Sequence, residues 1–326
     1  MTVEAYSLRT MISETGKPMI LQHLGYIELP PHARKGGFDH AAYRCADDRL
    51  YVAHTANDAV DVIDCAADRY LHSISGLTGV AGVLTAQERD LVFTSNRAED
   101  TVGIFASDDH NHLAKVLVGH RPNGLAHDSL RHVLLAANVG DSAIPGSATA
   151  SIVDVEARSV VASVPMPGRT RWALFAQGQD VFFINIADPP CIVVIEASNP
   201  TEIAKTFEIP AAGPHGLDLD VAAQRLFCAC DAKRLICLDA RSGKVSHDLA
   251  LSGTPDVIFF NAQLGHLYVA IGDPGVIDIV DTERMRLVET IKTEAGAHTI
   301  GFDVQGNKIY AFLPGTHRAA VYRDQG

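Results

Sequence analysis

The sequence lacks the motifs that usually reveal an enzyme or a nucleic-acid-binding protein. It contains no G-x-S-x-G nucleophile elbow, no H-E-x-x-H zinc helix, no phosphate-binding loop and no dinucleotide fingerprint. No apolar run approaches the roughly 18 residues of a membrane span. Lysine and arginine total only 27 against 39 aspartates and glutamates, and the formal net charge is −12. Nucleic acid and an anionic membrane surface are therefore poor partners, and a small molecule is the expected one.

Cysteine is scarce and has no zinc-type spacing. The six cysteines include no C-x-x-C pair. Cys228 and Cys230 lie two apart on an expected strand, so they share a face, and a turn at 231–233 would set Cys228 opposite Cys237. Two interpretations stay open: small core residues in a reducing compartment, or a cross-strand disulfide or soft-metal site. Residues 1–17 show no apolar stretch after a basic start, so we expect a cytoplasmic protein, or a periplasmic one if a leader was removed.

What the sequence does contain is a repeat. Short polar-centred patterns such as Pro-His-Gly and Pro-Asn-Gly recur, with central residues at 40, 81, 123, 172, 215, 256 and 298, separated by 41, 42, 49, 43, 41 and 42 residues. Seven units of this length, each composed of short strands, predict an all-β, seven-bladed β-propeller of four-stranded antiparallel blades. The unit around 214–251 shows the pattern best, with strands expected at 216–220, 225–230, 234–239 and 244–251.

Two of these pieces resemble a known family. The runs 50–54 (LYVAH) with 60–64 (VDVID), and 214–217 (PHGL), are similar to YVTN-type repeat proteins and to lactonase-like and streptogramin-lyase-like propellers. The resemblance spans nearly the whole chain. It implies the seven-bladed fold, and it implies little about activity, because the matching residues form strands and turns.

The ends of the chain predict how the ring closes. After His298 only three strands remain, whereas residues 20–30 resemble the outer strand of a blade. We therefore expect a single domain over 1–326 in which residues 18–30 supply the fourth strand of the last blade.

Residues at the repeat register should converge on one end of the ring. The connection into the first strand of a blade and the turn between its second and third strands lie at the same end. Blades five, six, seven and one are neighbours in a closed ring, and they carry His215, Asp256, His298 and His40. Three imidazoles and a carboxylate suit a divalent metal ion such as zinc, manganese or iron, with Asp256 as the fourth ligand or as a general base. The alternative is a water-filled channel lined by polar residues that suit the turns.

Other residues in this register are candidates for binding a substrate. Arg171 could hold a carboxylate, and Trp172, the only tryptophan, could form an apolar wall. Asn123, Asn138, Asn185 and His54 also belong to the mouth in this scheme. An insertion at 139–149 either shapes the site or is a tolerated surface loop.

Two functions follow from these residues. The first is a metal-assisted hydrolase or lyase that acts on a small carbonyl compound such as a lactone or cyclic ester, with Asp256 and Arg171 as catalytic residues. The second is a propeller that binds a ligand or a protein without turnover. The sequence leaves the oligomeric state open.

Overall fold

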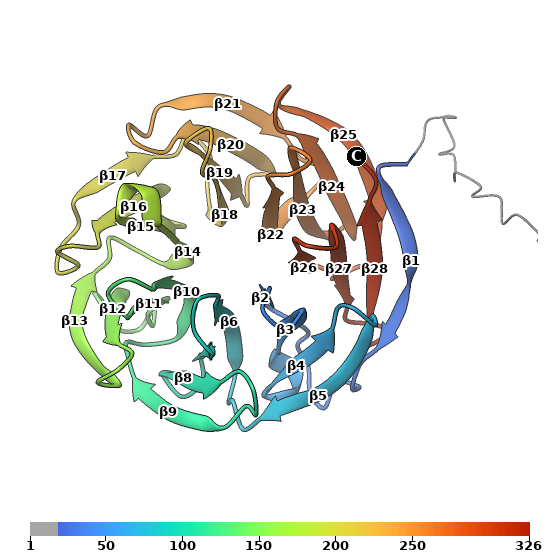
Figure 1. Cartoon of the computed structure of the whole chain (residues 1–326). Coiled ribbons are helices and arrows are strands. Elements are labelled where there is room, and N and C mark those ends of the chain that lie inside the picture. Colours follow the sequence, from blue (N-terminus) through green and yellow to red (C-terminus); the bar gives the residue numbers. More distant parts are fainter. Residues whose placement is uncertain (1–18) are drawn as a thin grey trace, which may run out of the picture.

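The computed structural model describes residues 19–326 and shows a closed ring of seven four-stranded antiparallel sheets, as predicted (Figure 1). Residues 1–18 lie outside the described residues. They include the start of the predicted closing segment and the N-terminal stretch on which the expected cytoplasmic location depends. Among residues 19–326 no helix has the length and apolar character needed to cross a membrane.

Blades 1 to 6 follow the chain, with the first strand of each at the ring axis and the fourth at the rim. Blades 1 to 3 comprise β2 (Ala41–Arg44), β3 (Arg49–His54), β4 (Ala59–Asp64), β5 (Arg69–Ser75); β6 (Val80–Ala86), β7 (Leu91–Asn96), β8 (Thr101–Ala106), β9 (His112–Leu117); β10 (Pro122–Asp128), β11 (Val133–Asn138), β12 (Thr149–Asp154) and β13 (Ser159–Pro165). Blades 4 to 6 comprise β14 (Thr170–Ala176), β15 (Val181–Ile186), β16 (Cys191–Glu196), β17 (Lys205–Glu208); β18 (Pro214–Asp220), β19 (Arg225–Cys230), β20 (Arg234–Asp239), β21 (Val245–Ala250); β22 (Thr254–Asn261), β23 (His266–Asp273), β24 (Val276–Asp281) and β25 (Arg286–Lys292). Two short 3₁₀ turns, η1 (Thr55–Asn57) and η2 (Gln177–Gln179), follow β3 and β14.

Blade 7 combines the two ends of the chain. It contains β26 (Thr299–Asp303), β27 (Lys308–Leu313) and β28 (Arg318–Asp324), and β1 (Leu21–Glu28) is its outer strand. β1 pairs antiparallel with β28, from Leu21 opposite Asp324 to Glu28 opposite Arg318. The carboxylate of Glu289 on blade 6 also accepts hydrogen bonds from the amides of residues 20 and 21, at 3.1 and 3.0 Å. The predicted closing strand is thus confirmed for the described residues.

Apolar side chains fill each space between neighbouring blades. The described residues form seven core clusters, one for each blade interface. Second and third strands such as β19 and β24 are apolar on both faces, because each is covered by a blade on either side. Outer strands such as β13 are mostly exposed. The cores therefore hold the ring together, and the two ends of the ring remain for function.

The hairpin in blade 5 differs from the prediction by one residue. Cys228 lies opposite Ile236, and Cys237 lies opposite Phe227. The turn holds residues 231–233 as expected, but a turn of three residues sets Cys228 opposite residue 236, so Cys237 points to the other side of the sheet. All six cysteines are free, and Cys228 and Cys230 lie on one face with sulfurs 3.8 Å apart. The cross-strand disulfide is therefore wrong.

Candidate functional site

The repeat register places one residue of each blade at the same end of the ring, here called the mouth. In blade 1 the amide of Ala53 donates to the carbonyl of His40 (2.9 Å), and the amide of Asp39 donates to the carbonyl of Ala53 (2.8 Å). These bonds join the entry to the first strand with the end of the second strand. The turn between β19 and β20 lies at the mouth in the same way, because the amide of Asp231 donates to the carbonyl of Gly213 (2.8 Å).

One arc of the mouth is a chain of imidazoles and carboxylates. His215 lies between two aspartates, with Nδ1 2.8 Å from Asp231 Oδ1 and Nε2 3.1 Å from Asp256 Oδ1. The other oxygen of Asp256, Oδ2, lies 4.0 Å from His298 Nε2. His298 Nδ1 is 2.7 Å from the carbonyl of Gly296, which leaves Nε2 as the nitrogen that faces the mouth. Three of the four predicted metal ligands thus form one connected row.

The charges in this row depend on each other. Burial by itself would lower the pKa of His215, but Asp256 and Asp231 outweigh burial and raise the pKa to about 9. Burial would raise the pKa of Asp256, but His215, His298 and His40 hold it well below its usual range. At neutral pH the row therefore contains an imidazolium held between carboxylates.

Arg171 contacts the same histidine. Its Nη1 lies 3.0 Å from His215 Nε2, and its Nη2 lies 3.3 Å from Asp231 Oδ2. A neutral ring would accept a hydrogen bond from Arg171, whereas a charged ring donates to Asp256 instead. We favour the charged ring because two carboxylates face it, and the contact between Arg171 and Asp231 holds in either state.

His40 forms the other side of the mouth together with Trp172. The rings stack with centroids 4.1 Å apart, although the two residues belong to blades 1 and 4. His40 is buried, and burial lowers its pKa despite Asp39, whose Oδ1 lies 3.5 Å from His40 Nε2. Trp172 also packs against cores on both sides of the axis. The indole therefore spans the axis and forms the floor of the mouth.

A cluster of four arginines lies on the opposite arc, and sequence reasoning found only one of them. Arg121 lines one cavity with Arg97 and another with Arg169. Burial lowers the pKa of Arg169, and the charges of Arg171, Arg121 and Arg97 lower it further. Arg97 bonds to Asp39 (3.3 Å) and to the side-chain oxygen of Asn123. Among residues 19–326, the side chains of Arg121 and Arg169 have no hydrogen-bond or ion-pair partner. Arg121 and Arg169 precede the register positions 123 and 172 by two and three residues, which was the available signal, whereas Arg97 directly follows the second strand of blade 2.

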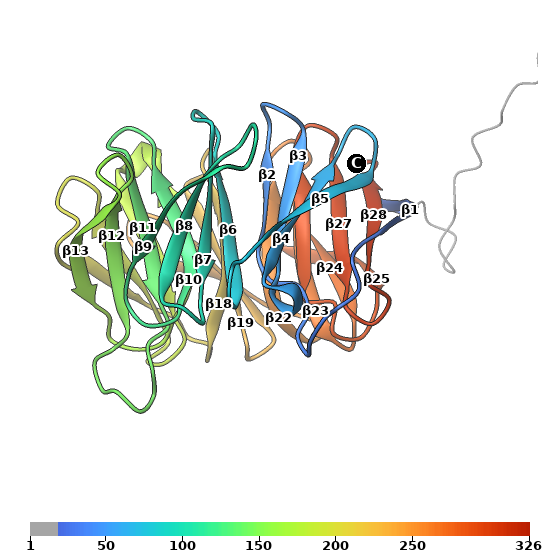
Figure 2. The ribbon, with the colours of Figure 1, turned by 90° about the horizontal axis from the view of Figure 1, so that it is seen from below.

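Two cavities surround this arginine cluster. One of about 430 Å³ contains Arg97, Arg121 and His120, and another of about 340 Å³ contains Arg121 and Arg169. The insertion between β11 and β12 forms much of the second cavity and protrudes from the ring (Figure 2). The loop therefore lies beside the arginines rather than apart from the mouth.

Three residues predicted to bind substrate point into the protein instead. His54, Asn138 and Asn185 are fully buried. His54 Nδ1 lies 2.7 Å from Asp61, Asn138 donates to Thr149 and Ser151, and Asn185 donates to the carbonyl of His215. Their polar groups connect strands within and between blades. Asn123 is also buried, but its side chain reaches Arg97 at the mouth.

The four predicted metal ligands lie at the same mouth, but their ligand atoms do not converge on one point as a coordination shell requires. Within residues 19–326, only Asp48, Cys65 and Asp303, at the opposite face, have possible ligand atoms that all lie within 4.8 Å of one another. Both ring nitrogens of His215 are already in contact with other side chains, and Arg171 places a cation beside Nε2. Metal binding through His40, His215, His298 and Asp256 stays a prediction.

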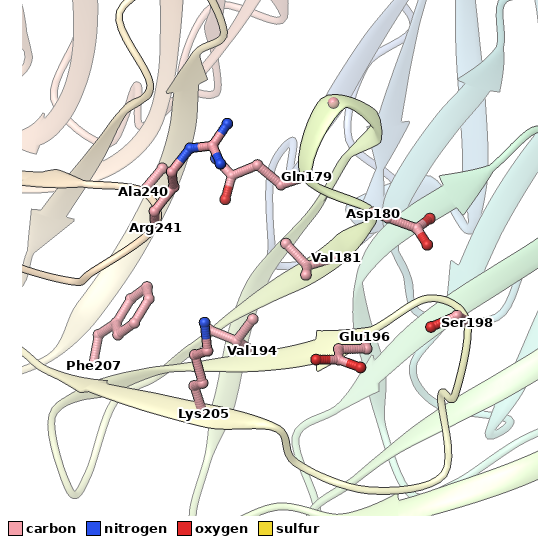
Figure 3. Close-up of a pocket in the computed structure, with 11 residues that line it drawn as sticks. Gln179, Asp180, Val181, Val194, Glu196, Ser198, Lys205, Phe207, Ala240 and Arg241 are labelled. Carbon is pink, nitrogen blue, oxygen red and sulfur yellow. The ribbon is translucent and has the colours of Figure 1, made fainter.

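A further groove of about 430 Å³ lies between blades 4 and 5, away from the mouth (Figure 3). Its lining includes Lys205 and Arg241 together with Val194 and Phe207. None of the predicted site residues lines this groove, so the mouth remains the candidate site.

Comparison with solved structures finds the same ring elsewhere. The chain is similar to hydrazine synthase from Kuenenia stuttgartiensis, with a TM-score of 0.79 and 12% sequence identity over 90% of this chain and 98% of that one. Identity this low shows the fold alone. No family model matches the chain, and no curated protein matches its sequence. The seven-bladed propeller is therefore shown, and the resemblance to YVTN-type and lactonase-like proteins stays a prediction.

Proposed function

We propose that this protein is a hydrolase or lyase that acts at the mouth on a small anionic carbonyl compound, such as a lactone or cyclic ester that carries a carboxylate. The second candidate is a propeller that binds such an anion without turnover. Both candidates use the same residues, and turnover distinguishes them.

The observation that carries the proposal is the arginine cluster. Arg121 and Arg169 have no acidic partner among the described residues, although the chain has a net charge of −12. Four neighbouring guanidiniums repel one another unless an anion lies between them. Guanidiniums bind carboxylates with two parallel hydrogen bonds, which fixes the orientation of a ligand as well as its position.

The facing arc supplies groups that can move a proton. His298 Nε2 is open to the mouth, because Nδ1 is engaged with a backbone carbonyl. Asp256 lies between His298 and His215 and orients both rings. In a hydrolase, His298 would take a proton from the attacking water. In a lyase, it would take the proton next to the carbonyl. Arg171 would hold the developing negative charge.

A metal-assisted form of this reaction is supported by the connected row of His215, Asp256 and His298, with His40 nearby. An ion bound there would polarise the carbonyl or activate water. It would also require His215 to give up its contact with Arg171 or Asp231. Metal analysis of the purified protein, prepared without chelators, tests this form. About one equivalent per chain, reduced in both the His40→Ala and the His298→Ala variants, supports it. Wild-type metal content in both variants contradicts it.

The test for catalysis is a screen of small lactones and esters with and without a free carboxylate. We expect turnover only for anionic compounds. Replacing His298 with Gln should lower kcat by roughly 100-fold or more while ligand affinity changes only a few-fold. His247→Gln, on the outer strand β21, is the matched control and should retain full activity. Saturable binding of anions without any turnover would favour the binding protein instead.

A further inference from the structure

A further cavity, here called the axial cavity, lies along the ring axis and opens at the face opposite the mouth. Its volume is about 550 Å³, which lies in the range of small-molecule sites. The first strands of blades 1 to 4 form most of its wall, and blades 6 and 7 contribute Phe259 and Phe302. Its lining includes six large apolar side chains: Leu84, Leu125, Leu174, Phe175, Phe259 and Phe302.

The inner end of this cavity is the stacked pair that forms the floor of the mouth. His40 and Trp172 both line the cavity, and Phe259 lies edge-on to the indole with ring centroids 6.5 Å apart. Since His40 and Trp172 come from opposite sides of the ring, the pair separates the axial cavity from the mouth. Any molecule that fills the cavity to its inner end would contact Trp172.

The polar groups of the wall are mostly satisfied by the protein itself. Thr85 donates to the carbonyl of Tyr43 (2.8 Å), Gln87 donates to Thr85 (2.9 Å), and the hydroxyl of Tyr43 donates to Asp48 (2.7 Å). His127 is the exception, because its Nε2 is buried without a hydrogen-bond partner and neither ring nitrogen bonds to a described residue. Burial lowers the pKa of His127 to about 4, so the ring is neutral at pH 7.

The axial cavity differs from the mouth in the charge of the residues that line it. Among the described residues its lining contains no lysine or arginine, and Glu88 is the one acidic side chain. An anionic substrate of the arginine cluster would therefore be disfavoured here, whereas an uncharged molecule would meet apolar walls and a neutral imidazole. We propose that the axial cavity binds a small, uncharged, largely apolar molecule, in contact with Trp172 and at a site distinct from the mouth.

Titration with the neutral fluorescent probe N-phenyl-1-naphthylamine tests this proposal. We expect saturable binding of about one probe per chain, with quenching of the Trp172 emission. Leu84→Glu places a charge in the wall and should weaken binding at least 10-fold. Leu117→Glu, at a leucine that is 72% exposed on the outer strand β9, is the matched control and should bind like the wild type.

A second variant covers the case in which Leu84→Glu fails to fold. Ser129→Phe, in the turn at the open end of the cavity, adds bulk without entering a core and should also weaken binding at least 10-fold. Arg169→Gln at the mouth should leave probe binding unchanged, which separates this site from the proposed function. The proposal is overturned if the wild type shows no saturable binding, if Trp172 does not respond, or if the folded cavity variants bind normally.

Discussion

The mouth and the axial cavity are built from the same first strands, yet they have opposite chemistry. Residues at the start of these strands, with others that directly follow second strands, bring four arginines, three histidines and three aspartates to one end. Residues about two to four positions further along, such as Leu84 and Leu174, make the other end apolar. The propeller repeat places these positions on rings around one axis, and the side chains on each ring then decide what that end can bind.

Closure of the ring holds both the mouth and the axial cavity in place, so opening the ring should have the largest effect, which is a loss of stability. Removing residues 1–30 deletes β1 together with the buried side chains of Leu21 and Ile27, and it uncovers β28. We expect the melting temperature to fall by roughly 10 °C or more, or the chain to fail to fold. Thermal unfolding followed by circular dichroism measures this effect. A deletion of residues 1–18 stops short of β1 and serves as the control. Equal melting of the two truncated chains would contradict closure by β1.

The arginine cluster is the feature that most clearly separates the mouth from the cavity. Replacing Arg121 and Arg169 together with Gln should weaken the binding of an anionic ligand by roughly 10- to 100-fold, because charged hydrogen bonds are lost. Calorimetric titration at two salt concentrations measures the loss, and the wild type should show the steeper salt dependence. The Lys205→Gln, Arg241→Gln double variant, at the remote groove, makes the same change of charge away from the mouth. A similar loss in that control would point to a general electrostatic effect.

The imidazolium of His215 should make stability depend on pH. Its pKa rises from an ordinary 6.5 to about 9, so the protonated ring stabilises the fold fully below pH 6.5. This stabilisation, on the order of 2 kcal/mol, should disappear as the pH rises through 9. Denaturant unfolding between pH 6 and pH 10 measures it, and the His215→Gln variant should lose this slope. His266, whose pKa is also raised, contributes equally to both proteins. An unchanged slope in the variant would contradict the charged pair.

The smallest expected effect concerns Trp172, which lies between the mouth and the axial cavity. Trp172 contacts His40 at the mouth and also lines the apolar cavity. Iodide should therefore quench its fluorescence about two-fold more than caesium does, because the guanidiniums concentrate anions at the mouth. The Arg121→Gln, Arg169→Gln double variant should remove this difference. Equal quenching by both ions in the wild type would place the indole away from the arginines.

The sequence predicted well those features that depend on local pattern. The strands expected at 225–230 and 234–239 are β19 and β20, and the expected closing strand overlaps β1. These predictions succeeded because apolar runs, turn residues and a repeat of about 42 residues constrain a blade before any neighbour is considered. The pairing expected for Cys237 was wrong by one residue, because the three-residue turn at 231–233 sets Cys228 opposite Ile236, and a shift of one residue reverses the side of the sheet.

The candidate site was predictable only in part. The shared register of His215, Asp256 and His298 correctly placed them at one end of the ring, because equivalent positions in each blade lie at equal height along the axis. The same register does not say which way a side chain turns. His54, Asn138 and Asn185 lie at the ends of second strands, where neighbouring strands and blades cover them, and their polar groups bond to the protein.

By itself, the sequence determined the seven blades, their order and the closing role of the first strand, because backbone pairing and apolar burial follow local periodicity. Only the tertiary structure decided that Arg97, Arg121 and Arg169 join Arg171, and that Trp172 stacks on His40 across the axis. These contacts join residues up to 132 positions apart in the chain, and they exist because closing the ring brings blades 1 to 4 around a common axis.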